Sequence, residues 1–414
     1  MNKIQTATYH FGILFCLAIG LLLTACSGDS ASDNAFDSRE SNRQIRLSAG
    51  ARQFNDDEDI TAAPAMTRAV SYPSTDWTNY LTLYPGSDPS MLVFIAKNND
   101  NPSTSDVLSR LCSFSNVNND WQANVTITDT GSGYQIFGFM PIDLENSSDN
   151  VSISPLTKAN SSDKSYTVGT QMTIRGLKVL TTLDPCVIVG VGSMENNTSD
   201  VTLQWGKFDF TFKENGSSDV TDYMSILLDH IYSRFHFSMK IDADYAQLRT
   251  IRITKMTVEA LYDDGASTLR SVDATVTIRS NTTDSNPIAG ITFTRNKGSK
   301  SITLFDKETT TNAALTNGIV LDKTKTTYQE VGFCLAPCDQ RWFRLTTEYE
   351  VLDRDGNIIR EDEAVNSFST ADFKVNKIMS TTPGLEHTIQ MTVNPTYLYM
   401  LSDPDLDNPT ITTN

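Results

Sequence analysis

Histidine is scarce in this chain, with 4 among 414 residues. The three that follow residue 25 are His230, His236 and His387, and none stands in a metal-binding spacing such as HxxxH. No cysteine lies in a nucleophile motif, and no acidic residue is marked as one of a catalytic pair. His236 alternates with apolar neighbours, which is typical of a packed or edge position in a strand. The sequence therefore gives no residue a catalytic, metal-binding or cofactor-binding role, and we expect a protein that is not an enzyme.

Basic residues are also few. The chain has 33 Lys and Arg against 50 Asp and Glu, which gives a formal net charge of −17. An acidic surface of this kind repels phosphate backbones and anionic lipid headgroups. We therefore expect no nucleic-acid partner, and any membrane attachment has to come from another source.

The chain contains no apolar run long enough to cross a bilayer, which takes roughly 20 residues. The run that begins near Phe11 spans about a dozen residues, a length typical of a secretory signal after a positive charge such as Lys3. It closes with Leu23-Thr24-Ala25-Cys26, which resembles the lipobox of bacterial lipoproteins. In a lipobox the signal is cut before the cysteine and the thiol is acylated. We therefore expect residues 1–25 to be removed and Cys26 to carry lipid, with an ordinary signal peptide as the alternative.

The number of cysteines is compatible with an exported chain but does not determine which of them form disulfides. Four cysteines follow Cys26, and an even number permits disulfides whose connectivity cannot be read from sequence; they are Cys112, Cys186, Cys334 and Cys338. Cys334 and Cys338 have neither CxxC spacing nor the second ligand pair of a structural zinc site. We interpret these two as buried thiols or as a local bridge.

One short strand stands between two flexible segments near the start of the mature chain. Residues 27–43 are polar and acidic, as expected of a flexible tether. Ile45, Leu47 and Ala49 then alternate with polar residues, which predicts a half-buried strand. A second polar stretch with an acidic run at 56–59 leads to Arg68 and Ala69. Residues 26–68 thus read as a lipidated leader that carries one strand.

Beyond Asp76 the pattern is β almost throughout. Short alternating runs rich in Thr, Val, Ile, Tyr and Phe are separated by turn-forming clusters; they lie at 124–128, 134–139, 171–174, 186–191, 207–212, 234–241, 251–260, 274–278, 291–294, 301–304, 344–351, 357–361 and 387–393. Asp355-Gly356 predicts a tight hairpin turn. The longest helical pattern covers Val220–Ile231. With a boundary near 215–220, we expect two tandem β-sandwich domains, 69–218 and 219–414.

Several segments together resemble the fimbrillin-like proteins of Bacteroidales, the type V pilin superfamily. They are the lipobox ending at Cys26, the strand 45–49 followed by Thr67-Arg68-Ala69, the segment 228–239, and the ending with Pro383-Gly384 and Tyr397-Leu398-Tyr399. The resemblance covers most of the chain as a pattern rather than as one sharp motif.

The resemblance implies two transthyretin-like β-sandwich domains and a pilus subunit that matures by proteolysis. In that family a trypsin-like protease cuts after Arg or Lys and removes the first strand with its lipid, and a strand of a neighbouring subunit fills the groove. Here the cut is expected between Arg68 and Ala69, and the removable strand carries Ile45, Leu47 and Ala49. Arg43, Arg46 and Arg52 are competing cleavage sites, of which only Arg52 also frees the whole strand.

The expected donor is the C-terminal segment in which Tyr397, Tyr399 and Leu401 alternate, although a buried strand of its own domain fits that segment as well. Strand addition of this kind follows from an open sheet edge and an apolar slot. The implied partners are other pilin subunits, outer-membrane lipid through Cys26, and host or bacterial surface glycans or proteins. The implied location is the outer membrane and cell surface.

Three alternatives stay open on the sequence. The first is an uncleaved anchor or tip subunit of the same superfamily. The second is a surface lipoprotein that binds glycans through exposed aromatic side chains. The four tryptophans are Trp77, Trp121, Trp205 and Trp342. Tryptophans in strands more often pack in the core than bind a ligand. The third is a hydrolase.

Overall fold

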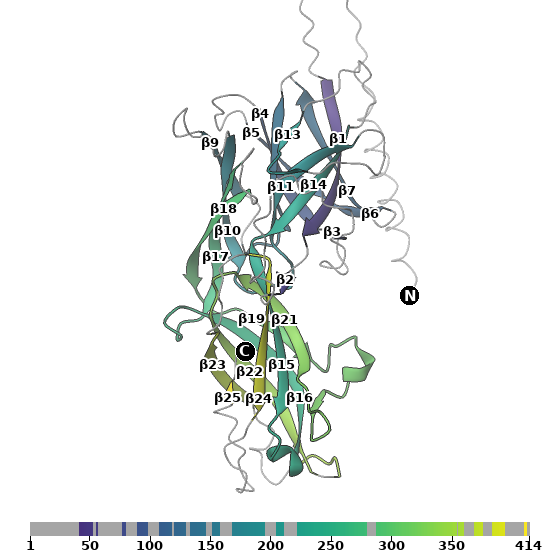
Figure 1. Cartoon of the computed structure of the whole chain (residues 1–414), viewed down its shortest axis with the longest axis vertical. Helices are drawn as coiled ribbons and strands as arrows, with labels where there is room; N and C mark the ends of the chain where they lie inside the picture. The colour runs from purple at the N-terminus through teal and green to yellow at the C-terminus, as the bar shows by residue number, and fades with distance from the viewer. Residues whose placement is uncertain are drawn as a thin grey trace, which may run out of the picture. The chain divides into compact units, whose positions relative to one another are not determined.

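The computed structural model describes residues 41–52, 55–56, 77–79, 89–97, 107–117, 120–129, 133–145, 151–157, 168–194, 204–210, 222–279, 287–353, 355–359, 368–375, 383–393 and 410–411. The chain divides into two units, Met1–Glu40 and Ser41–Asn414, and every described residue belongs to the second. Its described elements are β-strands apart from two short 3₁₀ turns, η5 (Tyr245–Gln247) and η6 (Ala313–Leu315) (Figure 1). The all-β class predicted from the sequence is confirmed. Among these residues we find no helix with the length and apolarity needed to span a membrane.

The largest sheet, sheet A, has eleven strands. Its hydrogen-bonded order is β5-β4-β8-β11-β14-β1-β7-β6, with β12 beside β11, β13 beside β8 and β3 beside β1. The strands are β1 (Ser41–Arg52), β3 (Trp77–Asn79), β4 (Ser90–Lys97), β5 (Val107–Ser113), β6 (Ser115–Val117), β7 (Asp120–Asp129), β8 (Tyr134–Met140), β11 (Cys186–Met194), β12 (Gln204–Trp205), β13 (Asp209–Phe210) and β14 (Asp222–His230).

Sheet C joins strands that are far apart in the sequence. Its order is β18-β17-β10-β9, with strands β9 (Val151–Thr157), β10 (Val168–Lys178), β17 (Leu269–Arg279) and β18 (Ile288–Lys297). Every second residue of β17 from Val272 to Ile278 is buried, so this sheet buries one face. The division at residue 218 stays a prediction. The sheets add that β14 and β17 lie after that position and hydrogen-bond with strands that lie before it.

Sheets B and D face each other through phenylalanine rings. Sheet B has the order β2-β24-β15-β21 with β25 beside β24, and sheet D has the order β19-β16-β22-β23 with β20 beside β16. Phe235 on β15 lies 5.1 Å from Phe343 on β22, measured between ring centroids, and Phe343 lies 5.9 Å from Phe373 on β23. Aromatic pairs at these separations add to the burial of apolar area in a core.

The bounds of these strands follow the alternating runs of the sequence. Sheet B contains β2 (Asn55–Asp56), β15 (Tyr232–Ile241), β21 (Gln329–Pro337), β24 (Leu385–Val393) and β25 (Thr410–Ile411). Sheet D contains β16 (Thr250–Leu261), β19 (Ser301–Asp306), β20 (Ile319–Leu321), β22 (Trp342–Leu352) and β23 (Phe368–Lys374).

The helix predicted over Val220–Ile231 is wrong, because the described part of this segment is strand β14. Its apolar spacing has another cause. Met224, Ile226, Leu227 and Leu228 are all at most 4% exposed, so β14 is buried on both faces. A strand buried on both faces reads as a continuous apolar run, whose period does not distinguish it from a helix.

The Asp355-Gly356 turn forms as predicted, but its second arm does not become a strand. Gly356 has a φ of 83°, which glycine adopts at little cost, and its amide donates to the Asp353 carbonyl. Asp353 Oδ1 also accepts from the amides of Asp355 and Asn357. After the turn Ile358 forms an antiparallel bridge to Leu352, flanked by hydrogen bonds from the Asp353 amide to the Asn357 carbonyl and from the Ile359 amide to the Val351 carbonyl. Among its described residues 357–359, the strand predicted over 357–361 is thus reduced to a single bridge.

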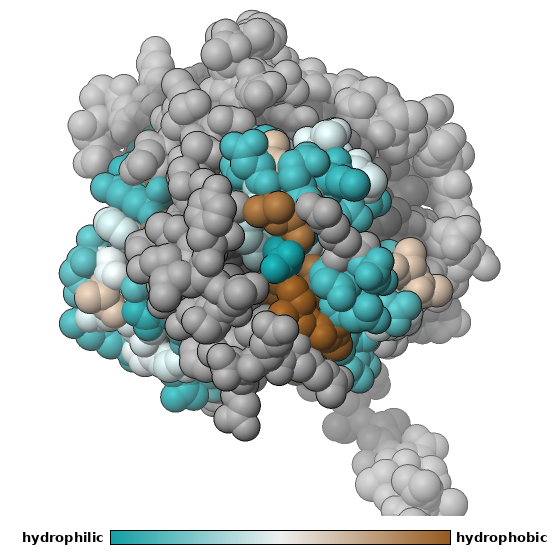
Figure 2. Space-filling model, turned by 90° about the horizontal axis from the view of Figure 1, so that it is seen from below, coloured by the Kyte–Doolittle hydropathy of each residue, from teal (hydrophilic) through white to brown (hydrophobic). Residues whose placement is uncertain are grey.

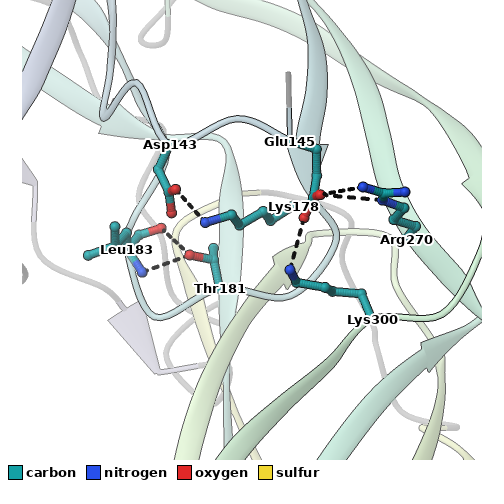
Figure 3. Close-up of polar contacts among 7 residues, drawn as sticks. All are labelled: Asp143, Glu145, Lys178, Thr181, Leu183, Arg270 and Lys300. Atoms are coloured by element: carbon teal, nitrogen blue, oxygen red, sulfur yellow. Dashed lines mark hydrogen bonds and ion pairs between the residues drawn. The ribbon is translucent and has the colours of Figure 1, made fainter. Parts of the chain in front are cut away.

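Ion pairs link the residues that follow β8 to the second half of the chain (Figure 3). Glu145 Oε2 accepts hydrogen bonds from Arg270 at 3.3 and 3.1 Å, and Oε1 lies 3.3 Å from Lys300 Nζ. Burial alone would raise the pKa of the Glu145 carboxyl, but the hydrogen bonds and charges of Arg270 and Lys300 outweigh burial and lower this pKa. Beside this group Lys178 pairs with Asp143. Both acids follow β8 of sheet A, and their partners Lys178 and Arg270 lie on β10 and β17 of sheet C, while Lys300 lies between β18 and β19.

The surface viewed from below Figure 1 is hydrophilic over most of its coloured part. The hydrophobic residues visible there gather near its centre, between hydrophilic residues (Figure 2). Among the described residues, the large hydrophobic side chains with at least about a third of their area exposed are Leu108, Leu111 and Phe333. Apolar side chains are thus concentrated in the core, as the alternating sequence pattern predicts.

Replacing Phe343 by Ala is expected to lower the free energy of unfolding by about 3–5 kcal/mol, because its ring is fully buried between sheets B and D. The measurement is urea unfolding of the chain that lacks residues 1–25. Phe333→Ala is the control, since this ring is 37% exposed, and we expect it to cost about 1 kcal/mol or less. Equal losses in the two variants would contradict the packing of these sheets.

Candidate functional site

Strand β1 lies in the interior of sheet A rather than at its edge. Along one side, residues 45–51 pair in parallel with residues 222–228 of β14. Along the other side, residues 41–48 pair antiparallel with residues 129–122 of β7. In the hydrogen-bonded order β1 is the strand that connects β14 to β7. The strand predicted at 45–49 is therefore confirmed, and it extends in both directions.

The side chains of β1 alternate as the sequence predicts. Ile45 and Leu47 are 0% exposed and belong to the core, while Ala49 is half-buried and packs against it. Between them Arg46 is half-buried, and Gln44 is exposed. Fully burying an Ile or Leu side chain is worth about 1.5–3 kcal/mol, so these two side chains contribute much of what holds β1 in place.

Loss of β1 would change sheet A in two ways. The facing backbone N–H and C=O groups of β7 and β14 would lose their partners, and the space filled by Ile45 and Leu47 would be empty. Unpaired edges next to an apolar slot favour the addition of another strand. A strand that took over the pairing of β1 would run parallel to β14 and antiparallel to β7.

The leader reaches a second sheet through β2. Asn55 and Asp56 pair in parallel with Leu385 and Glu386 at the start of β24, on the outer side of sheet B. At the other end of β24, Thr410 and Ile411 of β25 pair with Thr392 and Met391. Two short strands, one before residue 68 and one near the C-terminus, thus cover the same edge of β24.

The remaining predicted site residues lie outside the described residues. They are Cys26, Arg68, Ala69, Tyr397, Tyr399 and Leu401. Lipidation at Cys26, cleavage between Arg68 and Ala69 and the donor role of 397–401 therefore stay predictions. The side chains of Trp77, Trp121 and Trp205 lie outside the described residues too, whereas Trp342 is half-buried, and a Cβ on Gly265 would come within 3.1 Å of its ring.

The four cysteines that follow Cys26 are buried thiols, and no disulfide joins any two of them. Cys334 and Cys338 thus follow the first of the two interpretations made from sequence. Burial raises the pKa of the Cys112 thiol to about 12, and burial together with the neighbouring Asp339 raises that of Cys338 to about 12 as well. Thiols with such pKa values are inert as nucleophiles at neutral pH.

The fold brings together three chemically reactive residues that the sequence did not connect. Asp184 lies just before β11, Cys186 begins β11, and His230 ends β14. His230 Nδ1 lies 2.5 Å from Asp184 Oδ2 and 3.7 Å from Cys186 Sγ, and all three residues are 0% exposed. Both contacts use the same ring nitrogen. A catalytic triad uses opposite ring nitrogens and an accessible nucleophile, so this arrangement does not perform nucleophilic catalysis.

His236 lies in an ion-pair network on sheet B. Its Nε2 lies 2.9 Å from Glu386 Oε1 and its Nδ1 lies 3.1 Å from Glu330 Oε1. Hydrogen bonding to Glu386 raises the pKa of His236 against the lowering effect of burial, and the histidine in turn lowers the pKa of Glu386. His236 also lies 5.5 Å from the ring of Phe333. The expectation of a packed or edge histidine fits these contacts.

Comparison with known proteins gives matches only among solved structures. No family model and no curated protein matches the chain. A fimbrial protein of Bacteroides vulgatus ATCC 8482 is 11% identical, with 90% of this chain and 98% of that chain covered and a TM-score of 0.38. A candidate cell adhesion protein of Bacteroides fragilis NCTC 9343 is 10% identical, with 90% and 97% covered and a TM-score of 0.40. A candidate polysaccharide-binding protein of Bacteroides thetaiotaomicron VPI-5482 is 10% identical, with 86% and 93% covered and a TM-score of 0.29.

Replacing Glu386 by Gln is expected to lower the pKa of His236 toward its unperturbed value of about 6.5, because its main hydrogen-bonding partner loses its charge. The measurement is an NMR titration of the His236 ring. Because the pKa of His236 is raised in the folded chain, protonation of this side chain stabilises the fold. The stabilisation is complete below the pKa of the unfolded chain and is lost as pH rises through the pKa of the folded chain. Glu330→Gln is the control, with a smaller decrease because this side chain is 66% exposed. A larger decrease in that control would contradict the assignment.

Proposed function

We propose that the chain is a structural subunit of a pilus, exported as a lipoprotein through Cys26, cut after Arg68 and polymerised by donor-strand exchange, serving cell adhesion. The observation that carries the proposal is the position of β1. An interior strand with two fully buried side chains is encoded at the very start of the described chain, ahead of the expected cleavage site. The sequence segments that resemble fimbrillin-like proteins support the same reading.

The strand pairing disfavours cleavage at the three competing arginines. Arg43 and Arg46 pair with β7, and Arg52 pairs with Trp77 of β3, so the backbone of all three is hydrogen-bonded within sheet A. Proteases act on exposed backbone that can be drawn into an extended conformation. Arg68 lies between β2 and β3 in the sequence and outside the described residues, so cleavage there stays a prediction.

A cut after Arg68 would place β1 and β2 on the departing fragment and leave β3 with the body. Sheet A would then lose the strand between β14 and β7, and sheet B would lose the strand beside the start of β24. A cut after Arg52 would instead leave β2 on the body. Cleavage at either site removes β1, but only cleavage after Arg68 also removes β2 from the edge of β24.

The incoming strand would run parallel to β14 and present apolar side chains at every second position, in the places of Ile45 and Leu47. Tyr397, Tyr399 and Leu401 have this spacing. The segment is followed by β25, which pairs with β24, so donation by the C-terminus would require β25 to leave that edge. The partners would be other pilin subunits, and adhesion would be to surface glycans or proteins.

An uncleaved anchor subunit is the second candidate, and one observation favours it. With β1 paired on both sides, the uncut chain has no gap between β14 and β7. Such a chain would stay attached to the outer membrane through Cys26 and accept no strand in sheet A. Both candidates place the protein at the outer membrane and cell surface, and neither is an enzyme.

Arg68→Ala is expected to abolish maturation in the producing bacterium. The measurement is the N-terminus and mass of the protein recovered from the cell surface, together with its SDS-resistant ladders. The wild-type chain should begin at Ala69 and form ladders, because strand exchange follows leader removal. The variant should begin at acylated Cys26 and run as a monomer. Arg52→Ala is the matched control and should behave as wild type.

A wild-type chain that begins at Cys26 and forms no ladder would exclude the polymerising subunit and leave the anchor. A wild-type chain that begins after Arg52 would move the cleavage site and retain β2 on the body. Ladders from a chain whose β1 is still present would contradict strand exchange at this groove.

Leu47→Ala is expected to lower the free energy of unfolding of the uncut chain by about 2–5 kcal/mol, because it empties a fully buried position. The same substitution should leave the stability of assembled, cleaved subunits unchanged, since the departing fragment carries residue 47. Thermal unfolding of both forms measures the difference. A loss of equal size in the assembled form would show that β1 stays in the mature subunit.

A further inference from the structure

Asp184, Cys186 and His230 form a cluster of three different donor types inside the protein. Their ligand atoms all lie within 4.8 Å of one another, and the three residues are completely buried. We propose that this cluster binds one Zn(II) ion in a closed structural site. The proposal does not rest on the proposed pilus function.

The donor set matches zinc better than the common oxygen-binding cations. Zn(II) takes thiolate, imidazole and carboxylate ligands, whereas Ca(II) and Mg(II) prefer oxygen alone. A carboxylate that binds through both oxygens would bring the donor atoms of Asp184, Cys186 and His230 to four, the usual number in structural zinc sites. Because all three residues are 0% exposed, the site has no open position for a substrate.

The distances place two of the ligands close to their metal-bound spacing. Zinc bonds of about 2.0–2.1 Å to nitrogen and about 2.3 Å to sulfur put these atoms about 3.6 Å apart in a tetrahedron. His230 Nδ1 and Cys186 Sγ lie 3.7 Å apart. The nitrogen and the carboxylate oxygen of Asp184 lie 2.5 Å apart and would have to separate to about 3.4 Å.

The strands hold the two ligands that need not move. Cys186 and His230 are direct cross-strand partners in the β11–β14 ladder. The His230 amide donates to Asp229 Oδ1 at 2.9 Å, and the Ile231 amide donates to the Pro185 carbonyl at 3.0 Å. A Cβ on Gly384 would lie 3.0 Å from His230 Cδ2, so the ring edge away from Nδ1 is closely packed.

The ligand that has to move lies outside regular structure. Asp184 follows the segment 179–183 and precedes β11, so rotation of its side chain does not break a strand. On binding, the cation would replace the proton between Nδ1 and Oδ2 and the proton of the Cys186 thiol, and both protons would leave to solvent. No electron transfer is involved.

The position of the site indicates what a bound ion would stabilise. Cys186 and His230 lie on neighbouring central strands of sheet A, and Thr181, three residues before Asp184, bridges to Leu335 of β21 in sheet B. An ion held by all three ligands would therefore fix the segment 179–185 to β11 and β14. Since a ligand that binds only the folded state adds to stability, the melting temperature would rise with metal.

Cobalt(II) is the spectroscopic probe, since it takes the place of zinc and its tetrahedral thiolate complexes absorb in the visible and near ultraviolet. The chain that lacks residues 1–25 is unfolded in urea with a chelator and a reductant. The chelator is then removed, and the chain is refolded with one equivalent of Co(II), because buried ligands load most readily while the chain folds. We expect visible d–d bands, a thiolate-to-cobalt charge-transfer band, and loss of both when one equivalent of Zn(II) is added.

Cys186→Ser should remove the charge-transfer band, and His230→Gln should remove stoichiometric binding. Cys334→Ser is the matched control, because this thiol is equally buried and belongs to another sheet, and it should keep the spectrum. The wild-type protein purified without chelator should contain one zinc per chain. Its melting temperature should fall when a chelator removes that zinc. A wild-type chain that shows no charge-transfer band and no zinc would overturn the proposal, as would an unchanged band in Cys186→Ser.

Discussion

The backbone pairing of β1 on both of its sides is the interaction on which sheet A depends. In the hydrogen-bonded order, β5, β4, β8, β11 and β14 stand on one side of β1, and β7 and β6 stand on the other. Each peptide group of an interior strand needs a partner, because a buried unpaired N–H or C=O costs a large part of a hydrogen bond. A sheet built around a strand from the extreme end of the described chain is complete only while that strand, or one equivalent to it, is in place.

The rest of the fold keeps the body together independently of β1. Sheet C pairs β10 with β17, so residues near 170 hydrogen-bond with residues near 278. Strand β14 continues through Ile231 into β15 of sheet B, and Glu145 binds Arg270 and Lys300 from the second half of the chain. The β10–β17 pairing and the Glu145 ion pairs join segments more than 90 residues apart, and neither involves the leader. Loss of β1 would therefore open a groove in a body that its own strands still hold together.

The sequence predicts single strands well and long-range relations poorly, for physical reasons that particular residues make clear. Ile45 and Leu47 are buried as their alternation predicts, because β1 has one buried face. Strand β14 was predicted as a helix because both of its faces are buried, which removes the period of two. The pairing of β17 with β10 has no local signal at all, since any alternating strand fits any exposed edge of suitable length.

The cluster of Asp184, Cys186 and His230 was missed for the same reason. His230 stands 44 residues after Cys186, and only the register of β11 against β14 brings the two together. Metal-ligand motifs that can be recognised in a sequence have short spacings, which these three residues lack. Cys186 begins a segment that the sequence predicts as a strand, and His230 lies in the segment predicted as a helix, so no sequence pattern placed the two side by side.

A buried Asp–His pair also bears on the groove beside β14. Burial of a carboxylate costs several kcal/mol unless a partner neutralises it, and the observed register of β11 against β14 places Asp184 beside such a partner, His230. A shift of β11 against β14 by one residue would separate Asp184 from His230, so this pair adds to the contacts that specify the register. Strand β1 pairs with β14 up to Leu228, two residues before His230. The cluster therefore holds in place the strand that any occupant of the β1 position has to meet, and an edge that is already ordered costs less to bind than one that must be ordered on binding.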